Sequence, residues 1–400
     1  MSELRFLTAG ESHGPALIAI LEGLPAGLLL SAADINADLA RRQMSFGAGG
    51  RMTIERDAAQ ILGGVMAGAT TGAPLALLIP NLDHAHWQGR PVAPMTTPRP
   101  GHGDLTGAVK YGYRDLRLAL ERASARETGA RVAVGAACRK LLADFNIRVG
   151  SYVVEIGGVA ASVDELGVTE RLARAETSDV RCPDEAAAAA MRARISAAME
   201  ARDTVGGLFE VVALGAPPGL GSHVQWDRRL GPRLAAALMS IPAIKGVEVG
   251  SAFANARRSG TEVHDEIFLE TGTGRLVRRT NRSGGLEGGM TTGEPIVLRA
   301  AMKPISTTLN PLRSVNLVSG EPAATQYERS DYCAVPRAAV VGEAMMCFVL
   351  AGGLLEKLGG DSVAEMKPRF EALRQARLDD LTMDNVPTIF WPAEPGGGDR

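Results

Sequence analysis

The chain has 400 residues, of which 46% are hydrophobic and 22% are charged, and its formal net charge is -2. These values are ordinary for a globular protein, and the length allows one large domain or two to three smaller ones. The small net charge argues against nonspecific nucleic-acid binding.

The longest apolar stretch near the N-terminus is interrupted by Glu22 and Pro25, and no run approaches the about 18 residues of a membrane span. The four cysteines lie far apart and form no CxxC pair, so neither a zinc site nor a disulfide framework is indicated. We therefore expect a reduced, cytoplasmic protein with no metal site and no nucleic-acid or membrane partner.

Short apolar or alternating segments predict strands, and longer periodic segments predict helices. The expected strands are Leu4–Thr8, Ala16–Leu21, Met52–Glu55, Leu75–Ile79, Arg148–Ile156, Leu208–Leu214 and Ile296–Ala301. The expected helices are Ser31–Gln43, Glu121–Phe145, Asp184–Asp203, Arg228–Met239 and Pro336–Leu358. The segment Leu166–Asp184 is expected to be polar and irregular, and Pro392–Arg400 to be a disordered tail. Because the strands are clustered and do not alternate strictly with helices, the pattern favours a mixed α+β architecture.

Two of the six histidines lie in similar glycine-flanked turns, Gly10-Glu11-Ser12-His13-Gly14 and Gly101-His102-Gly103. A histidine beside glycine has little neighbouring bulk, so its ring can meet a ligand. An imidazole can also give or take a proton near neutral pH. The repeated pattern predicts that both histidines belong to one shared site.

The first turn also fits the G-x-S-x-G pattern of serine hydrolases, with Ser12 as nucleophile. The apolar run Ala16–Leu21 that follows is too short for the helix that such a turn requires. A hydrolase that uses Ser12, Asp331 and a downstream histidine stays open as the second hypothesis.

Other segments allow both a plain and a functional interpretation. The glycine-rich stretches 47–50 and 284–289 give neither GxGxxG nor a P-loop, which argues against dinucleotide and NTPase folds. The residues Lys303–Thr307 offer a charge and hydroxyl groups suited to a phosphate. The segment Arg122–Thr128 is either an anion-binding helix start or a solvated helix end. The segment Asp83–His86 lacks a third metal ligand nearby and is expected to be a polar loop.

Taken together, these segments resemble the chorismate synthase family from Thr8 to about Ser362. The matching segments are TAGESHG at 8–14, RPGHGD at 99–104, KYG at 110–112, RASARET at 122–128, RVAVG at 131–135, SIPAIKGVEVG at 240–250, TNRSGGLEGG at 280–289, KPIST at 303–307 and RSDYCAVPR at 329–337. The resemblance implies a carbon–oxygen lyase of the shikimate pathway that removes phosphate from 5-enolpyruvylshikimate 3-phosphate by anti-1,4-elimination to give chorismate. It also implies reduced FMN as cofactor, because an electron-rich flavin supplies what no ordinary side-chain base could.

The resemblance also assigns roles to individual residues. It implies that His13 protonates the leaving phosphate, that His102 protonates or orients the flavin, and that Asp331 serves in proton transfer at the flavin nitrogen. Ser12 and Ser124 would be supporting hydroxyls. The residues expected to contact the flavin are Arg122, Ala123, Ser124, Ala254, Asn255, Gly288, Lys303, Pro304, Ile305, Ser306, Thr307 and Arg329. The arginines expected to bind the substrate's carboxylates and phosphate are Arg42, Arg99, Arg131 and Arg337.

The implied fold is one large catalytic domain over residues 1–391, with core helices between antiparallel sheets, assembled as a homotetramer. Because no dinucleotide motif is present, we expect an external flavin reductase, so that NADPH would act only indirectly as reductant. The chain has Ala48 where members of the family usually carry an arginine that helps to hold the substrate phosphate. A divergent paralogue that acts on a related enolpyruvyl phosphate or has reduced activity therefore stays open, as does a noncatalytic flavin- or anion-binding protein.

Overall fold

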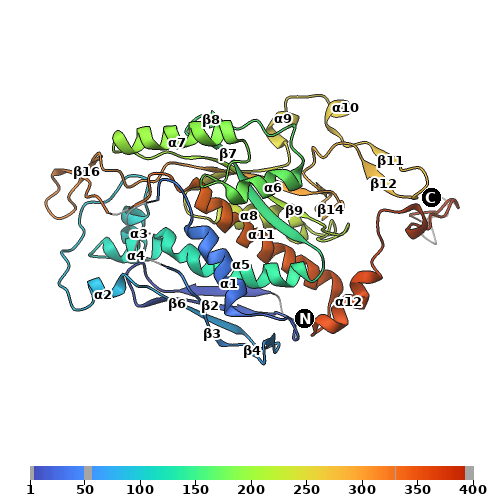
Figure 1. Ribbon diagram of the computed structural model, residues 1–400, viewed down its shortest axis with the longest axis horizontal. Coiled ribbons are helices and arrows are strands. Elements are labelled where there is room, and N and C mark those ends of the chain that lie inside the picture. Colours follow the sequence, from blue (N-terminus) through green and yellow to red (C-terminus); the bar gives the residue numbers. More distant parts are fainter. Residues whose placement is uncertain (1–3, 49–55, 329, 392–400) are drawn as a thin grey trace, which may run out of the picture.

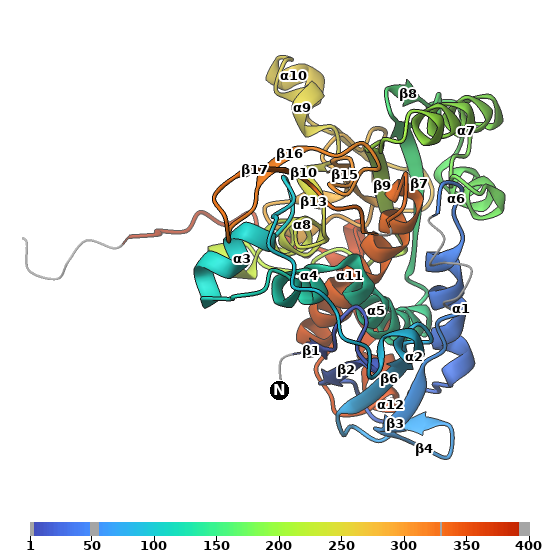
Figure 2. The same cartoon turned by 90° about the vertical axis from the view of Figure 1, so that its left-hand side faces the viewer.

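The computed structural model describes residues 4–48, 56–328 and 330–391, and in them two antiparallel sheets enclose a layer of helices (Figures 1 and 2). The first sheet has the strand order β1 (Arg5–Ala9), β2 (Ala16–Glu22), β6 (Leu75–Pro80), β3 (Gln60–Gly63). The second has the order β10 (Ile244–Val249), β15 (Ile296–Met302), β9 (Gly207–Leu214), β7 (Arg148–Ile156), β8 (Val159–Ala160). Neighbouring strands are antiparallel in both sheets. The expected strand Met52–Glu55 lies outside the described residues.

Three helices form the layer between the sheets: α1 (Ala32–Gln43), α5 (Thr128–Ala143) and α11 (Val335–Leu358). Helix α5 packs on β2 and β6, and α11 packs on α5 and on the far sheet through β7 and β9. The two helices approach closely at Gly135, where an added Cβ would lie 2.3 Å from the Cβ of Ala344. The predicted α+β fold with core helices between antiparallel sheets is therefore confirmed.

The ends of these helices follow from their sequence. Ser31 caps α1 and forms a capping box with Asp34. Helix α11 has a proline in its first turn and ends at Gly359, as expected from the sequence. By length and composition α11 could cross a membrane, but 89% of its apolar window is buried inside the protein, which marks it as a core helix.

Further helices cover the outside of this arrangement. Helices α6 (Val168–Thr177) and α7 (Glu185–Glu200) lie over β7 and β8, whereas α8 (Leu230–Met239) packs on α11 and β10. The remaining helices are α2 (His84–Trp87), α3 (Asp104–Tyr111), α4 (Arg117–Ala123), α9 (Ala252–Asn255), α10 (Gly260–Val263) and α12 (Val363–Glu371). Two-residue and three-residue strands form the hairpins β4 (Val65–Met66)–β5 (Ala69–Thr70), β11 (Ile267–Leu269)–β12 (Leu276–Arg278), β13 (Leu286–Glu287)–β14 (Met290–Thr291) and β16 (Arg313–Val315)–β17 (Pro322–Ala324).

Expectations about two longer segments were wrong. The segment expected to be irregular contains α6, whose apolar side, with Leu172 and Ala175, covers Tyr152 on the outer face of the second sheet. The long helix expected from Glu121 to Phe145 is broken at Ser124, which has extended backbone angles and separates α4 from a 3-10 turn at Ala125–Glu127 and from α5. The hydroxyl of Ser124 accepts a hydrogen bond from the backbone of Arg126, so a polar cap replaces the helical continuation.

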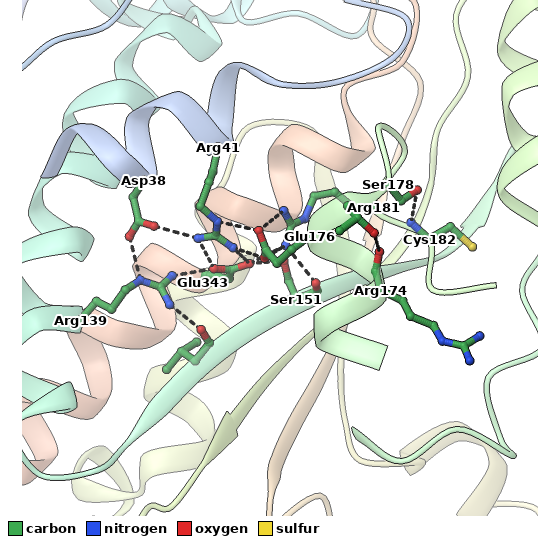
Figure 3. Close-up of polar contacts among 12 residues, drawn as sticks. Asp38, Arg41, Arg139, Ser151, Arg174, Glu176, Ser178, Arg181, Cys182 and Glu343 are labelled. Carbon is green, nitrogen blue, oxygen red and sulfur yellow. Dashed lines mark hydrogen bonds and ion pairs between the residues drawn. The ribbon is translucent and has the colours of Figure 1, made fainter. Parts of the chain in front are cut away.

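A network of three arginines and three carboxylates, buried around Glu343 and exposed at Glu176, connects the helical layer to β7 of the second sheet (Figure 3). Glu343 on α11 is fully buried and accepts hydrogen bonds from Arg41 at 2.8 and 2.9 Å and from Arg139 at 2.6 Å. Arg181, Asp38 and Glu176 complete the network. Although burial opposes ionisation, the three guanidinium groups hold the pKa of Glu343 below its ordinary value. The equal numbers of opposite charges make this burial tolerable.

Candidate active site

One cavity of about 610 Å³ collects segments that are far apart in the sequence. It lies where the loop after β1, the loop before α3, the break between α4 and α5, the end of α1 and the start of α11 meet. The sequence-predicted residues that line it are Ser12, His13, Arg42, Arg99, His102, Ala123, Ser124, Lys303, Ile305, Ser306, Asp331 and Arg337. The structure thus brings both glycine-flanked histidines to one cavity.

The loop that carries His13 depends on Gly10. This residue has a φ of +107°, and an added Cβ would lie 2.3 Å from the carbonyl oxygen of Ala16 at the start of β2. The loop therefore turns back tightly and presents the His13 ring beside α4. Nδ1 of His13 lies 2.7 Å from Oε1 of Glu121, and the backbone N–H of His13 donates to Oε2 of the same residue at 2.8 Å.

The surroundings of this pair restrict both partners. The His13 ring packs against Trp87, with ring centroids 4.2 Å apart and an angle of 37° between the ring planes. Burial opposes ionisation of Glu121, but the hydrogen bonds from His13 hold the pKa of its carboxyl below the ordinary value. His13 is therefore fixed on one side by a carboxylate and on one face by an indole.

His102 is held in a similar way. Its Nδ1 lies 2.5 Å from Oδ1 of Asp104, the first residue of α3. Arg99 donates to the same carboxylate from Nε at 2.8 Å and from Nη2 at 3.1 Å, and its Nη1 donates to Thr307 at 2.9 Å. Burial opposes the charge on Asp104, yet the contacts with His102 and Arg99 hold the pKa of this carboxyl well below its ordinary value.

Three arginines, Arg42, Arg126 and Arg337, form an arginine cluster at the cavity. Arg42 and Arg126 share the buried carboxylate of Asp57, at 2.5 and 2.7 Å, and Arg337 forms an ion pair with Asp331. Burial, together with repulsion from Arg337 and Arg126, lowers the pKa of Arg42 to about 10 despite its contact with Asp57. Nε of Arg42 is buried and has no hydrogen-bond partner among the described residues. Such a cluster favours binding of an anion, which would supply the missing negative charge.

Ser12 and Ser124 lie with their hydroxyl oxygens 3.1 Å apart at the same wall. Beyond Gly14 the chain enters strand β2 and not a helix, so the strand–turn–helix context of a hydrolase nucleophile is missing. The structure does not favour the serine hydrolase hypothesis.

Some predicted site residues lie elsewhere. Arg122 and Arg131 line an adjoining cavity of about 530 Å³, where Arg122 donates to backbone oxygens of Thr8 and Gly10 and Arg131 to Glu127 and Ser240. Pro304 and Thr307 flank lining residues, and Thr307 accepts the hydrogen bond from Arg99. Ala254, Asn255 and Gly288 are not among the residues that line the main cavity, and Arg329 lies outside the described residues.

The sequence analysis missed several residues at the cavity. Arg126, Glu121 and Asp104 all lie in or next to the motifs RASARET and RPGHGD, so their motifs were found but not their contacts. Asp57 and Trp87 had no sequence signal. The expectation of a polar loop at Asp83–His86 was wrong, because Asp83 precedes the short helix α2, which begins at His84. In this helix His84 Nδ1 contacts the His13 carbonyl oxygen at 2.9 Å, and Trp87 reaches the His13 ring.

These features define a class of protein. An α+β fold with two carboxylate-bound imidazoles and an arginine cluster around one cavity suits an enzyme that binds a multiply anionic small molecule and transfers protons. Comparison with known proteins identifies the family. The sequence profile described as "Chorismate synthase" matches residues 4–355, and the chain belongs to the chorismate synthase family.

Individual relatives agree. The chorismate synthase of Rubrobacter xylanophilus is 54% identical over 374 residues, covering 92% of this chain and 95% of the relative. That of Aquifex aeolicus is 54% identical over 387 residues, covering 92% and 96%. A solved structure titled "Crystal Structure of Chorismate Synthase" matches with a TM-score of 0.76 and 46% identity, covering 93% of this chain and 97% of that one. The protein is accordingly a lyase of the shikimate pathway.

Proposed function

We propose that this enzyme converts 5-enolpyruvylshikimate 3-phosphate to chorismate and inorganic phosphate by anti-1,4-elimination, with reduced FMN as cofactor. In this reaction a ring C–H bond and the C–O bond to phosphate break, and one proton and one phosphate leave. The observation that carries the proposal is that His13, His102 and the arginine cluster line the same cavity.

The proposed substrate carries two carboxylates and a phosphate, and the arginine cluster supplies matching charge. We assign Arg42, Arg126 and Arg337 to these anionic groups. Arg99 and Arg131, which the resemblance also implied, donate to the carboxylates of Asp104 and Glu127. We therefore propose that Arg99 holds Asp104 and His102 in place, and that Arg131 stabilises the adjoining cavity.

One wall of the cavity supports the proposal of a flavin cofactor. Gly101, Gly103 and Ala123 leave one wall without large side chains, and a Cβ added at Gly101 would lie 3.4 Å from Cβ of Ser306 and 3.5 Å from Nζ of Lys303. A flat ring can approach such a wall closely. Lys303, Ile305, Ser306, Ala123 and Ser124 would hold the cofactor. We propose that Ala254, Asn255 and Gly288 contact parts of the flavin that lie outside this cavity.

When bound, reduced FMN would supply electron density that assists departure of the phosphate. The flavin would end the reaction in its reduced form, so no net oxidation would occur. The protein's own residues bind, orient and protonate. His13 would donate a proton from Nε2 to the leaving phosphate, and His102 would hold a proton at its Nε2 toward the flavin. Asp331 would take part in proton transfer at the flavin, with Ser12 and Ser124 as hydrogen-bonding hydroxyls.

We further propose a cytoplasmic homotetramer, one catalytic domain over residues 1–391, and an external flavin reductase, so that NADPH would act only through that partner. Sedimentation velocity tests the assembly. Turnover with NADPH and oxidised FMN alone, without a reductase, would contradict the proposed source of reduced flavin.

The deciding experiment is an anaerobic assay with chemically reduced FMN and 5-enolpyruvylshikimate 3-phosphate, in which chorismate absorbance and phosphate release are followed together. We expect equal amounts of both products, and none with oxidised FMN. Phosphate release without chorismate, or release that does not depend on flavin, would overturn the proposal. Inhibition by a serine-directed phosphonate would instead support the hydrolase hypothesis.

A further inference from the structure

We infer that Glu121 is a positioning residue for His13, holding its imidazole with a proton on Nδ1 and with Nε2 left for the cavity. The inference deepens the proposed function, and its kinetic part rests on that function. Glu121 is not among the residues that line the cavity, so it would act through His13 and not by contact with the substrate.

The hydrogen bonds determine where the ring proton lies. A backbone N–H is always a donor, so Oε2 of Glu121 accepts from His13 N at 2.8 Å. An ionised carboxylate has only acceptor oxygens, so Nδ1 of His13, 2.7 Å from Oε1, must carry a hydrogen. Nε2 is then the nitrogen that gains and loses a proton at the cavity.

Two further contacts keep this arrangement in place. The tilted contact of the His13 ring with Trp87 limits rotation of the imidazole. His84 contacts the backbone oxygen of His13 at 2.9 Å, so the main chain is held from both sides of the residue. The pair is therefore fixed in both its backbone and its ring.

Arg117 provides the charge behind the carboxylate. It lies one helical turn before Glu121 on α4, and its Nε and Nη1 are buried without hydrogen-bond partners among the described residues. Burial acts against ionisation of Glu121, but the His13 contacts and then the Arg117 charge keep the pKa of its carboxyl low. Arg117 thus favours the charged acceptor that the His13 geometry needs.

The second histidine shares the contact between Nδ1 and a carboxylate. His102 Nδ1 contacts Asp104, and Arg99 donates to that carboxylate. Two imidazoles at one cavity therefore each have Nδ1 at a carboxylate, although at His102 Nη2 of Arg99 also lies 3.1 Å from Nδ1. A carboxylate in this position stabilises the imidazolium and fixes the tautomer, as a general acid requires.

The test is Glu121→Gln, which keeps the shape of the side chain but leaves one acceptor oxygen where His13 now uses two. Because the backbone N–H of His13 can only donate, the amide oxygen should take that bond. The amide NH₂ then faces Nδ1 and can only donate, so the ring proton should move to Nε2. Nitrogen-15 NMR spectra of the full chain with labelled histidine report the position of this proton. The His13 signal is assigned by its loss in His13→Asn. The spectra are recorded at about two pH units above the ordinary imidazole pKa, where the neutral ring predominates.

We expect the wild type to show the Nδ1–H tautomer and Glu121→Gln the Nε2–H tautomer. We also expect kcat of the variant to fall roughly 10²–10⁴-fold, with KM changed less than about threefold because Glu121 does not line the cavity. Glu11→Gln, the same change on an exposed side chain in the same loop, is the matched control and should alter neither readout.

An Nε2–H tautomer in the wild type would overturn the inference even if no variant folds. An unchanged tautomer or an unchanged kcat in a folded Glu121→Gln protein would overturn it as well. The spectra need neither substrate nor flavin, so a wild type that makes no chorismate would refute the proposed function without affecting the assignment of Glu121 to the ring of His13.

Discussion

Arg42 and Asp57 form a buried ion pair at the cavity, with Nη2 of Arg42 2.5 Å from Oδ2 of Asp57. The other oxygen of Asp57 accepts from Arg126 at 2.7 Å, so one carboxylate separates two guanidinium groups that would otherwise repel each other. Asp57 therefore holds Arg42 and Arg126 of the arginine cluster together, and the cluster still carries positive charge that can bind an anionic ligand.

We expect Asp57→Asn to lower the free energy of unfolding by about 3–5 kcal/mol, because it leaves two buried arginines without their shared counter-charge. Inorganic phosphate should then raise the Tm of the variant more than that of the wild type, since the ligand replaces the lost charge. Thermal unfolding with and without phosphate measures both effects. Asp227→Asn, at an exposed position, is the control. Equal phosphate effects in the wild type and Asp57→Asn would contradict the expectation.

A second prediction concerns the buried network around Glu343. Glu343→Gln should lower the free energy of unfolding by about 3–5 kcal/mol, because Arg41, Arg139 and Arg181 lose a buried partner. Glu170→Gln breaks an ion pair with Arg174 whose side chains are 50% and 51% exposed. It should cost less than about 1 kcal/mol. Urea unfolding of both variants makes the comparison, and similar losses would show that the network contributes no more than a surface pair.

The same network predicts a dependence of stability on pH. Burial opposes ionisation of Glu176, but hydrogen bonds from Arg41 and Arg181 lower the pKa of its carboxyl to about 2, and the pKa of Glu343 is also lowered. A carboxyl whose pKa is lower in the folded state stabilises above its unfolded pKa, and this contribution is lost as the pH falls toward the folded value. The difference in the free energy of unfolding between wild type and Glu343→Gln should therefore become smaller as the pH falls from about 5 to about 3. A constant difference in urea unfolding across this range would argue against these shifts.

The catalytic assignment predicts the effect of removing each histidine. His13→Ala and His102→Ala should each lower turnover on the order of 10²–10⁴-fold, if both act in proton transfer. His223→Ala, at an exposed position away from the cavity lining, should retain turnover. Steady-state chorismate formation under anaerobic conditions gives the ratios. Near-normal turnover in both cavity variants would refute their assignment.

Ala48 predicts an effect on substrate affinity. Its neighbour Gly47 accepts a hydrogen bond from the backbone N–H of Tyr332 at 3.0 Å, which places this turn next to Asp331 at the cavity. Ala48→Arg should lower KM for the substrate, because an added guanidinium can bind its phosphate. An unchanged KM would show that the arginine cluster already satisfies the phosphate.

The motifs identified most of the cavity, but not the contacts within it. RASARET was recognised, yet Arg131 was assigned to the substrate while Arg126 lies at the cavity. The break at Ser124 places Arg126 in a 3-10 turn at the main cavity, ahead of α5, which carries Arg131. A helical pattern continued through Ser124 could not show this. Trp87 and Asp57 reach the site only through packing of α2 and of the segment before β3, for which local sequence gives no signal.

The sequence by itself determined the family, the α+β class, most strands of both sheets and the two glycine-flanked histidine turns. These depend on local preferences and on ordered motifs, which are properties of short segments. Tertiary structure alone decided that Glu121 and Asp104 are the acceptors for the two imidazoles and that Asp57 joins Arg42 to Arg126. The physical reason is that a hydrogen bond or ion pair between distant segments exists only after the helices and sheets have packed, since packing fixes the few ångströms on which each contact depends.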